Sequence, residues 1–357
     1  RHDSTLHAVV TLTRERALDR ARSMDRELAA GRWRGPLHGV PYAAKDLFAV
    51  EDRPTTWGAA PYRVQVIEET ATVVSRLDSA GAVLVAKTTL GALAWGDVWF
   101  GGRTRNPWDT EEGSSGSSAG SAAAVSAGLV PFALGTETLG SLVSPATRTG
   151  VTALRPSFGR VSRDGAMVVA WSMDKVGPMC RFVEDCALVF EAIRGHDAED
   201  PTTVRGVGFP YDRDAELTDL SVGYLPSAFE GDYEGAAQDS AALDVLRELG
   251  AELVPVELPD RPVGAMGFIL GVEAAAAHDA LTRSDRDSLL TRQQAAAWPN
   301  VFRSARFIPA VEYLQANQVR RATGREMARA LEEVDVYVSP ATRGPHLLPP
   351  NLTGHPC

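Results

Sequence analysis

The chain has 357 residues, of which 44% are hydrophobic and 23% charged, so it is long enough to bury a large core as one or two globular domains. Its 46 acidic residues outnumber its 36 basic residues and give a formal net charge of −10, and no Lys/Arg cluster of the kind that binds nucleic acid stands out. No apolar stretch reaches the roughly 20 residues that a membrane-spanning helix needs, because glycines and Pro131 interrupt the longest one.

Helices and strands alternate along the chain, in the order expected of layered α/β proteins. The patterns predict helices over residues 14–30, 70–81, 121–128 and 183–195, and strands over 39–45, 82–87 and 130–135. A long surface connection is expected over 196–219, followed by strands over 221–227 and 252–259 around a helix. Residues 267–334 are predicted to be mostly helical and 334–340 a strand. No repeat is present, and nothing in the sequence forces a domain boundary.

For the first predicted helix, the sequence pattern also predicts the two ends and the buried face. Thr13 is expected to cap it and Gly31 to end it. Its apolar side chains recur at helical spacing and predict one buried stripe, formed by Ala17, Leu18, Ala21, Met24 and Leu28.

The three cysteines, Cys180, Cys186 and Cys357, show neither CxxC spacing nor the spacing of a zinc site. We interpret the first two as small buried side chains in a reducing compartment and expect a cytoplasmic location. None of the seven histidines has the spacing of a metal ligand, and we expect neither a metal nor a cofactor. No secretory leader is visible from Arg1 onward, although a first residue other than Met leaves one upstream open.

Two serine-rich turns lie in residues 113–144, which read GSSGSSAGSAAAVSAGLVPFALGTETLGSLVS. The first turn, residues 114–118, precedes an alanine-rich helix that ends at Gly128. The second turn, residues 136–141, follows an apolar run that suits a buried strand. A serine at the end of a strand, beside a flexible turn whose N–H groups can converge, permits acyl chemistry.

Two short motifs in or near these turns are interpreted as chance matches. Residues 116–120 spell GxSxG, the nucleophile elbow of α/β-hydrolases, with Ser118 as the nucleophile. That elbow must follow a buried strand, whereas the preceding residues are polar. Ser172 and Lys175 spell SxxK, but the companion motifs SDN and KTG are absent.

No histidine has the local spacing of a general base, which leaves Lys45 as the best candidate. It ends an apolar strand, and Asp46 need not neutralise it because successive strand residues face opposite ways. Lowering a lysine pKa from about 10.4 to about 7 requires the cation to be destabilised by roughly 4 to 5 kcal/mol, which burial can supply. An isolated lysine at a strand end would more often point to solvent.

Four segments resemble, in order and spacing, the amidase signature family of serine hydrolases. They read GVPYAAKD, GSSGSSAGSAAAVSAG, GTETLGS and GRVSRDGAMVVAWSMDKVGPM. The resemblance is continuous from about residue 36 to 193 and weaker in VDVYVSPAT and NLTGHP near the end. It implies a single α/β/α domain over residues 1–357 around a large mixed sheet. Because the family continues beyond a segment like NLTGHP, we expect the chain to be incomplete at its C-terminus.

The resemblance also implies roles for individual residues. Ser141 would be the nucleophile, Ser117, which lies 24 residues earlier, the bridging serine after a cis peptide, and neutral Lys45 the base. The activity implied is hydrolysis of the carbon–nitrogen bond of a small amide through an acyl-enzyme. The backbone N–H groups of the turn would form the oxyanion hole, from Thr138, Leu139, Gly140 and Ser141.

The sequence departs from the family pattern mildly at Ser115 and Ala119, which stay small, and more strongly in two later segments. GTETLGS has Glu137 and Leu139 where GTDTGGS is usual, and a leucine resists a positive φ that a glycine adopts freely. SLVSPA has Val143 where the usual SIRxPA has arginine, so a buried cation and its partner are expected to be missing.

The sequence therefore leaves three candidate functions. The first is an amidase acting on a small neutral or aromatic amide, with Trp95, Trp99 and Trp171 as candidate pocket walls, although core packing is the more common role. The second is the A subunit of a tRNA-dependent amidotransferase, a glutaminase with partner subunits, which the acidic charge and Val143 disfavour. The third is a catalytically silent amidase-like binding protein. A small-molecule amide is the expected partner, with no nucleic acid or membrane, and the sequence leaves a homo-oligomer open.

Overall fold

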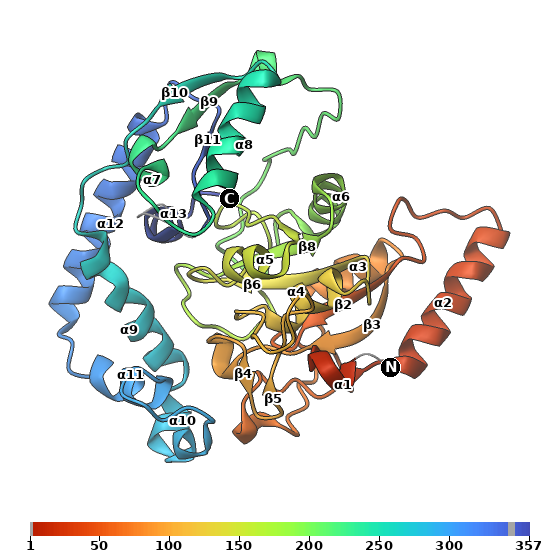
Figure 1. The fold of residues 1–357 in the computed structure, drawn as a ribbon. Helices are drawn as coiled ribbons and strands as arrows, with labels where there is room; N and C mark the ends of the chain where they lie inside the picture. The colour runs from red at the N-terminus through yellow and green to blue at the C-terminus, as the bar shows by residue number, and fades with distance from the viewer. Residues whose placement is uncertain (1–2, 342–346) are drawn as a thin grey trace. The chain divides into compact units, whose positions relative to one another are not determined.

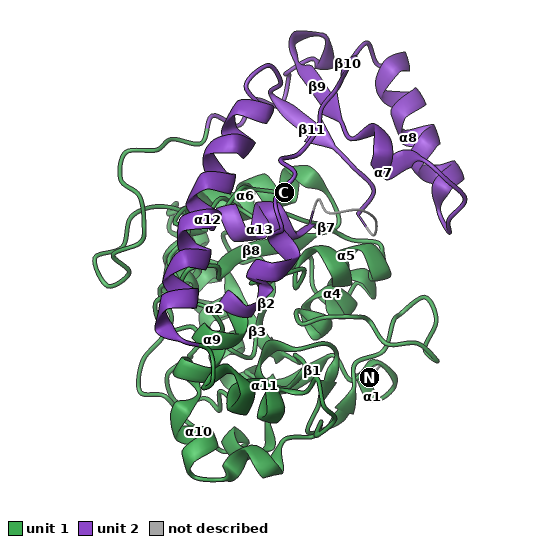
Figure 2. Ribbon diagram, turned by 90° about the vertical axis from the view of Figure 1, so that its left-hand side faces the viewer, with its two compact units in different colours: residues 1–209, 270–308, 354–357 green, residues 210–269, 309–353 purple. Residues whose placement is uncertain are grey.

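The computed structural model describes residues 3–341 and 347–357 (Figure 1). The described chain forms two compact units. The first lies within residues 1–209, 270–308 and 354–357, and the second within residues 210–269 and 309–353 (Figure 2). The single domain expected over residues 1–357 stays a prediction.

A six-stranded sheet forms the centre of the first unit, with the strand order β1-β3-β2-β6-β8-β7. Strand β2 runs parallel to both β3 and β6, whereas the outer pairings are antiparallel, so the sheet is mixed as predicted. The strands are β1 (Val9–Leu12), β2 (Pro41–Lys45), β3 (Val83–Thr88), β6 (Phe132–Glu137), β7 (Thr152–Ala153) and β8 (Lys175–Cys180).

Helices cover both faces of this sheet, because side chains along a strand alternate between its faces. Tyr42 and Ala44 of β2 lie in the larger apolar core, together with residues of α3 (Thr72–Ser79) and α6 (Val183–Ile193). Ala43 lies in a second core with residues of α4 (Ala119–Ser126). The α/β fold class and the layered architecture are therefore confirmed.

The helix predicted at the N-terminal end is present as α2 (Arg14–Ala29), but two details of the prediction are wrong. Thr13 precedes the helix without capping it, since its hydroxyl donates to the carbonyl of Leu84 at 2.7 Å. Part of the apolar stripe is solvent-exposed: Ala17 and Met24 are buried, whereas Leu18 and Leu28 are exposed.

Several elements of the first unit are not expected from the local pattern, among them β1, β7, β8 and α5 (Val143–Thr149). Strand β8 contains Gly177 and Pro178, which usually mark turns. Its six residues are all buried because it pairs on both sides, with β6 and with β7. Tertiary pairing therefore overrides the local signal here.

The remaining described elements of the first unit are short or helical. They are α1 (Asp3–Leu6), η1 (Ala60–Tyr62), η2 (Ala92–Ala94), β4 (Val98–Trp99), β5 (Gly102–Arg103), α10 (Asp279–Arg283), η5 (Arg286–Leu289) and α11 (Trp298–Ala305). Helix α9 (Phe268–Ala277) crosses the boundary between the units, at residue 270. The helical character predicted for residues 267–334 is confirmed.

The second unit contains a three-stranded parallel sheet in the order β10-β9-β11. Its strands are β9 (Ser221–Tyr224), β10 (Glu252–Pro255) and β11 (Val336–Val338), all three within the predicted strands. Its helices are η3 (Leu217–Asp219), α7 (Pro226–Phe229), α8 (Ala236–Glu248), η4 (Val263–Gly267), α12 (Ala310–Ala330) and α13 (Leu348–Thr353).

The structure also bears on membrane-spanning helices and on the state of the cysteines. Within residues 3–341 and 347–357, no helix is both long and apolar enough to cross a membrane. Cys180, Cys186 and Cys357 are all free thiols, and the first two are buried, as the sequence indicated.

Candidate active site

Lys45, the last residue of β2, is fully buried and points toward the serine-rich turn that precedes α4. Its ammonium nitrogen donates to the Ser117 hydroxyl at 2.8 Å and to the Ser118 hydroxyl at 3.1 Å. A third bond of 2.9 Å reaches Oγ1 of Thr136 in β6. Three hydroxyl groups from two segments therefore surround this nitrogen.

The environment of Lys45 favours its neutral form. Burial lowers the pKa of Lys45 to about 7, while the negative charges of Asp174 and Glu137 act in the opposite direction. Among the described residues, none of the ion pairs involves Lys45. A lysine with a pKa near 7 can accept a proton at neutral pH, which an ordinary lysine cannot.

Asp46 faces away from Lys45, as the alternation of the strand predicts. Its carboxylate lies 2.7 Å from the ammonium group of Lys87 on the neighbouring strand β3, and both side chains are fully buried. The backbone N–H of Thr56 donates to the same carboxylate at 2.9 Å. The acidic neighbour in the sequence is thus occupied elsewhere and does not neutralise Lys45.

The first serine-rich turn has an unusual backbone. The peptide bond between Gly116 and Ser117 is cis, as the resemblance implied. A Cβ on Gly116 would lie 2.0 Å from the carbonyl oxygen of Gly96, so the turn passes too close to that backbone for any side chain. Ser117 itself is buried, with 1% of its surface exposed.

The second turn joins the end of β6 to the start of α5 and carries Ser141. Its backbone contacts the first turn directly, because the N–H of Ser118 donates to the carbonyl of Ser141 at 3.1 Å. In the described part of the chain, no hydrogen bond joins the Ser141 hydroxyl to Ser117 or Lys45. The structure therefore brings Lys45 and Ser117 into contact and joins the backbone of Ser141 to that of Ser118, the residue after Ser117.

The backbone N–H groups of this second turn are available for a ligand. No hydrogen bond to another described residue uses the N–H groups of residues 138–141. Gly140 has a φ of 82°, whereas Leu139 is not among the residues with a positive φ. A leucine is therefore compatible with the backbone at position 139, although a glycine is usual there in the family.

The expectation that a buried cation and its partner are missing is wrong. Arg155 supplies the cation, and its guanidinium lies 2.7 Å from the carboxylate of Glu137, with both side chains buried. Val143 supplies no cation at the position where the family pattern has arginine, and Glu137 is paired with Arg155, in the segment after β7. This pairing could not be read from the sequence, because 18 residues separate the two positions.

Asp174 holds the other side of the turn, and the sequence patterns predicted no role for it. Its carboxylate accepts a hydrogen bond of 2.5 Å from the hydroxyl of Thr138 and further bonds from the N–H groups of Val169 and Ala170. Burial raises the pKa of Asp174, and the bond from Thr138 opposes that shift. Thr138 and Asp174 meet because β6 pairs with β8, with Glu137 opposite Lys175.

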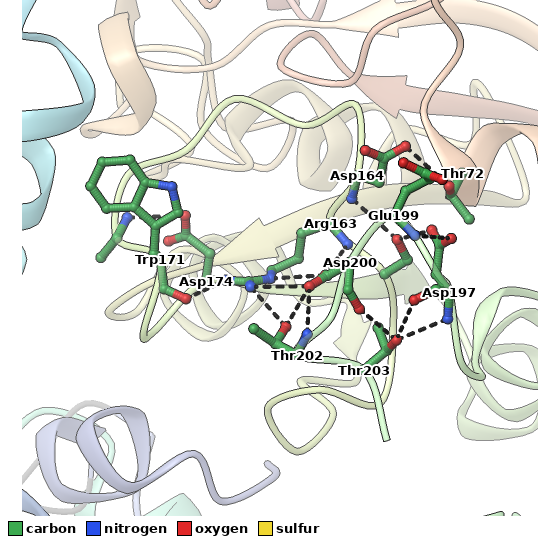
Figure 3. Close-up of polar contacts among 12 residues, drawn as sticks. Thr72, Arg163, Asp164, Trp171, Asp174, Asp197, Glu199, Asp200, Thr202 and Thr203 are labelled. Carbon is green, nitrogen blue, oxygen red and sulfur yellow. Dashed lines mark hydrogen bonds and ion pairs between the residues drawn. The ribbon is translucent and has the colours of Figure 1, made fainter. Parts of the chain in front are cut away.

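A cavity of about 390 Å³ lies beside Thr136 and Thr138. Its wall includes Met167, Trp171 and Asp174. Arg163 also lines it and is held in place by Asp200, by the carbonyl of Trp171 and by Thr202, as Figure 3 shows. The guanidinium of Arg163 is therefore fixed by its neighbours as part of the cavity wall.

The three tryptophans considered as pocket walls have different roles. Trp171 lines the cavity, and 47% of its surface is exposed. Trp95 packs edge-on against Trp298 with ring centroids 5.4 Å apart, and Trp99 against Phe100 at 4.8 Å. Of the three tryptophans, only Trp171 borders the cavity beside the second turn.

The side chains of the two motifs interpreted as chance matches form hydrogen bonds with other groups in the structure. The buried Ser118 hydroxyl donates to the carbonyl of Thr136 and accepts from its N–H, both at 3.1 Å, and no buried strand of the described chain leads into this turn. The Ser172 hydroxyl donates to Glu273 at 2.6 Å, and the Lys175 ammonium points toward the carbonyl of Thr138 at 3.5 Å.

Comparison with known families agrees with this geometry. The model of the Amidase family matches residues 1–352. The chain belongs to the amidase family. Amidase family members at this level of similarity include the A subunit of the glutamyl-tRNA(Gln) amidotransferase of Chromohalobacter salexigens, which is 36% identical over 97% of this chain and 76% of its own length.

Solved structures of amidase relatives superpose on nearly the whole chain. The peptide amidase of Stenotrophomonas maltophilia is 31% identical, with a TM-score of 0.84 over 100% of this chain and 83% of its own. A chain from a vestigial protein complex that bears on the origins of an s-triazine catabolic enzyme is 32% identical, with a TM-score of 0.89 over 99% of this chain and 83% of its own. The amidase fold of this chain is thereby shown.

Proposed function

We propose that this amidase family member hydrolyses the carbon–nitrogen bond of a small-molecule amide through Ser141, Ser117 and Lys45. The observation that carries the proposal is the 2.8 Å bond between the buried Lys45 nitrogen and the hydroxyl of Ser117. A lysine with a pKa of about 7 can act as a base at neutral pH. In a family of carbon–nitrogen hydrolases, that pair is suited to activate a serine.

The proposed reaction has two halves. The Ser141 oxygen attacks the amide carbonyl carbon while its proton passes to Ser117, and the Ser117 proton passes to Lys45. As the carbon–nitrogen bond breaks, the same route returns a proton to the departing amine and leaves an acyl ester on Ser141. Water then attacks the ester and releases the carboxylic acid, with Ser141 reprotonated.

The oxyanion of each tetrahedral intermediate needs hydrogen-bond donors. We assign this role to the backbone N–H groups of residues 138–141, which no described residue uses. The bond from Thr138 to Asp174 holds the start of this turn, and donors fixed before the reaction cost no reorganisation when charge develops.

The cavity beside Thr138 favours a small neutral substrate. Its volume of about 390 Å³ suits a compact molecule, and Trp171 and Met167 offer apolar surface. Of the two cations in its wall, Arg163 already bonds Asp200, Thr202 and the Trp171 carbonyl, and Lys175 donates to the carbonyl of Thr138, so we expect little affinity for an anionic substrate.

A second candidate function is that of an amidotransferase A subunit. It is favoured by the 36% identity to the corresponding protein of Chromohalobacter salexigens over 97% of this chain. Glutaminase chemistry would use the same three residues, so the two candidates differ in substrate and in partners. A protein that hydrolyses L-glutamine and copurifies with further subunits would fit this second candidate.

The test is an amide panel assayed by release of ammonia or nitroaniline, with primary amides, short peptide amides, p-nitroanilides and L-glutamine. We expect turnover by the wild type and its loss in Ser141→Ala and Lys45→Ala. Ser304→Ala, an exposed serine of α11, is the matched control and should retain wild-type turnover. If Ser141→Ala kept wild-type turnover, the proposal would be wrong and Ser118 would be the next candidate.

A further inference from the structure

The carboxylate of Glu137 closes the loop that carries Ser141. Glu137 ends β6, and one of its oxygens accepts hydrogen bonds from the N–H groups of Leu142 at 2.8 Å and Val143 at 3.0 Å. The chain therefore leaves the backbone of Glu137, passes through residues 138–141 and returns to the Glu137 side chain. Such a clamp restricts the turn at both ends, immediately before and immediately after the residues proposed to react.

Arg155 completes the clamp from a different segment. Its guanidinium donates to the other oxygen of Glu137 at 2.7 Å, and Arg155 is 1% exposed. A buried carboxylate that loses its paired cation is left with an uncompensated charge. The positive charge of Arg155 compensates that of Glu137, whose carboxylate holds the N–H groups of Leu142 and Val143.

We propose that Arg155 is a positioning residue for Ser141, acting through Glu137. The inference rests on the proposed function, because it concerns the same serine. Arg155 lies two residues beyond β7 and touches none of residues 138–141 by a hydrogen bond among the described residues. Its effect on catalysis is therefore indirect and should appear in the turnover rate rather than in substrate affinity.

Arg155 has a second set of contacts that a test must separate from this role. Its guanidinium donates to the carbonyl of His355 at 3.3 Å and lies 3.5 Å from that of Pro356. Its backbone exchanges two hydrogen bonds with Cys357, of 2.7 and 2.8 Å. A purely structural arginine would only anchor residues 354–357 to the rest of the first unit.

Three variants separate the two roles, assayed with the best substrate of the amide panel. Arg155→Met removes the cation and both sets of side-chain contacts. Arg155→Lys keeps the charge beside Glu137. The double variant Val143→Arg/Arg155→Met returns a cation to the turn from α5, at the position where the family pattern has arginine, while the contacts to His355 and Pro356 stay lost.

We expect kcat of Arg155→Met to fall at least about tenfold, with KM within about threefold of the wild type. Arg155→Lys should retain more than about a tenth of wild-type kcat, and the double variant should exceed Arg155→Met by at least about fivefold. A folded Arg155→Met with wild-type kcat would overturn the inference. So would a folded double variant, or a folded Arg155→Lys, that is no more active than Arg155→Met.

Folding is followed by circular dichroism. If Arg155→Met does not fold, a folded Arg155→Lys with less than about a tenth of wild-type kcat overturns the inference. Failure of this inference can be distinguished from failure of the proposed function. If Ser141→Ala abolishes turnover while Arg155→Met leaves it intact, only the positioning role is wrong. If Ser141→Ala is fully active, the proposed function is wrong as well.

Discussion

The carboxylate of Asp46 is paired with Lys87 of the neighbouring strand, at 2.7 Å, and not with Lys45, the residue before it in the chain. Both partners are fully buried, so this ion pair is held in a region of low polarity. The pairing keeps the Asp46 charge from neutralising Lys45. Burial lowers the pKa of Lys45, and the carboxylate of Asp46, the residue after β2, does not pair with it to oppose that shift.

Loss of one partner of this buried pair should destabilise the protein strongly. In Lys87→Met, the uncompensated Asp46 should lower the free energy of unfolding by about 3 to 5 kcal/mol, measured by urea denaturation. Arg22→Met removes a cation from an exposed pair with Asp19 and should change it by less than about 0.5 kcal/mol. A Lys87→Met protein as stable as the wild type would contradict the structural account.

The pH dependence of catalysis should report the protonation of Lys45. The base must be neutral, and burial lowers the pKa of Lys45 to about 7. We therefore expect kcat/KM to rise as pH increases through about 7 and then to level off. The measurement is a profile of kcat/KM from about pH 5 to 9. Circular dichroism at each pH shows that the protein is folded. A profile that is flat across this range would argue against Lys45 as the base.

Removal of the Asp174 charge should shift that profile in a defined direction. The carboxylate of Asp174 raises the pKa of Lys45, so Asp174→Asn should lower it and move the rising limb to lower pH. The same variant weakens the bond to Thr138 and should reduce the plateau of kcat. A rising limb that moves to higher pH would contradict the assigned electrostatics.

The close approach of Gly116 to Gly96 predicts that residue 116 tolerates no side chain. In Gly116→Ala, the new Cβ would lie 2.0 Å from a backbone oxygen, so the first turn must shift and turnover should fall by at least about tenfold. Gly208→Ala is the matched control, because nothing lies within 4 Å of its Cβ position. Equal turnover of the two variants would show that the turn adapts without cost.

The sequence predicts most of the elements that position Lys45 and Ser117. The apolar run that ends at Lys45 identifies β2, and the alanine-rich run identifies α4. The contact between Lys45 and Ser117, which precedes α4, follows from the resemblance. The burial of Lys45 does not follow from its place at a strand end, where a lysine more often points to solvent, and only the resemblance favours it.

The remaining contacts depend on pairings that local patterns do not carry. Glu137 and Arg155 meet because one ends β6 and the other follows β7, and β7 with its Thr152 and Ala153 is too short to leave a pattern. Thr138 and Asp174 meet through the pairing of β6 with β8, a strand whose Gly and Pro residues resemble a turn.

Direct labelling of Ser141 tests the central claim that this serine is an activated nucleophile served by Lys45. The protein is treated with a fluorophosphonate reagent, and the modified peptide is identified by mass spectrometry in the wild type, Ser141→Ala and Lys45→Ala. We predict one adduct on Ser141, absent from Ser141→Ala and formed at least about tenfold more slowly in Lys45→Ala. A wild type that gains no adduct while a control amidase is labelled, or that is labelled on Ser118, would contradict the account.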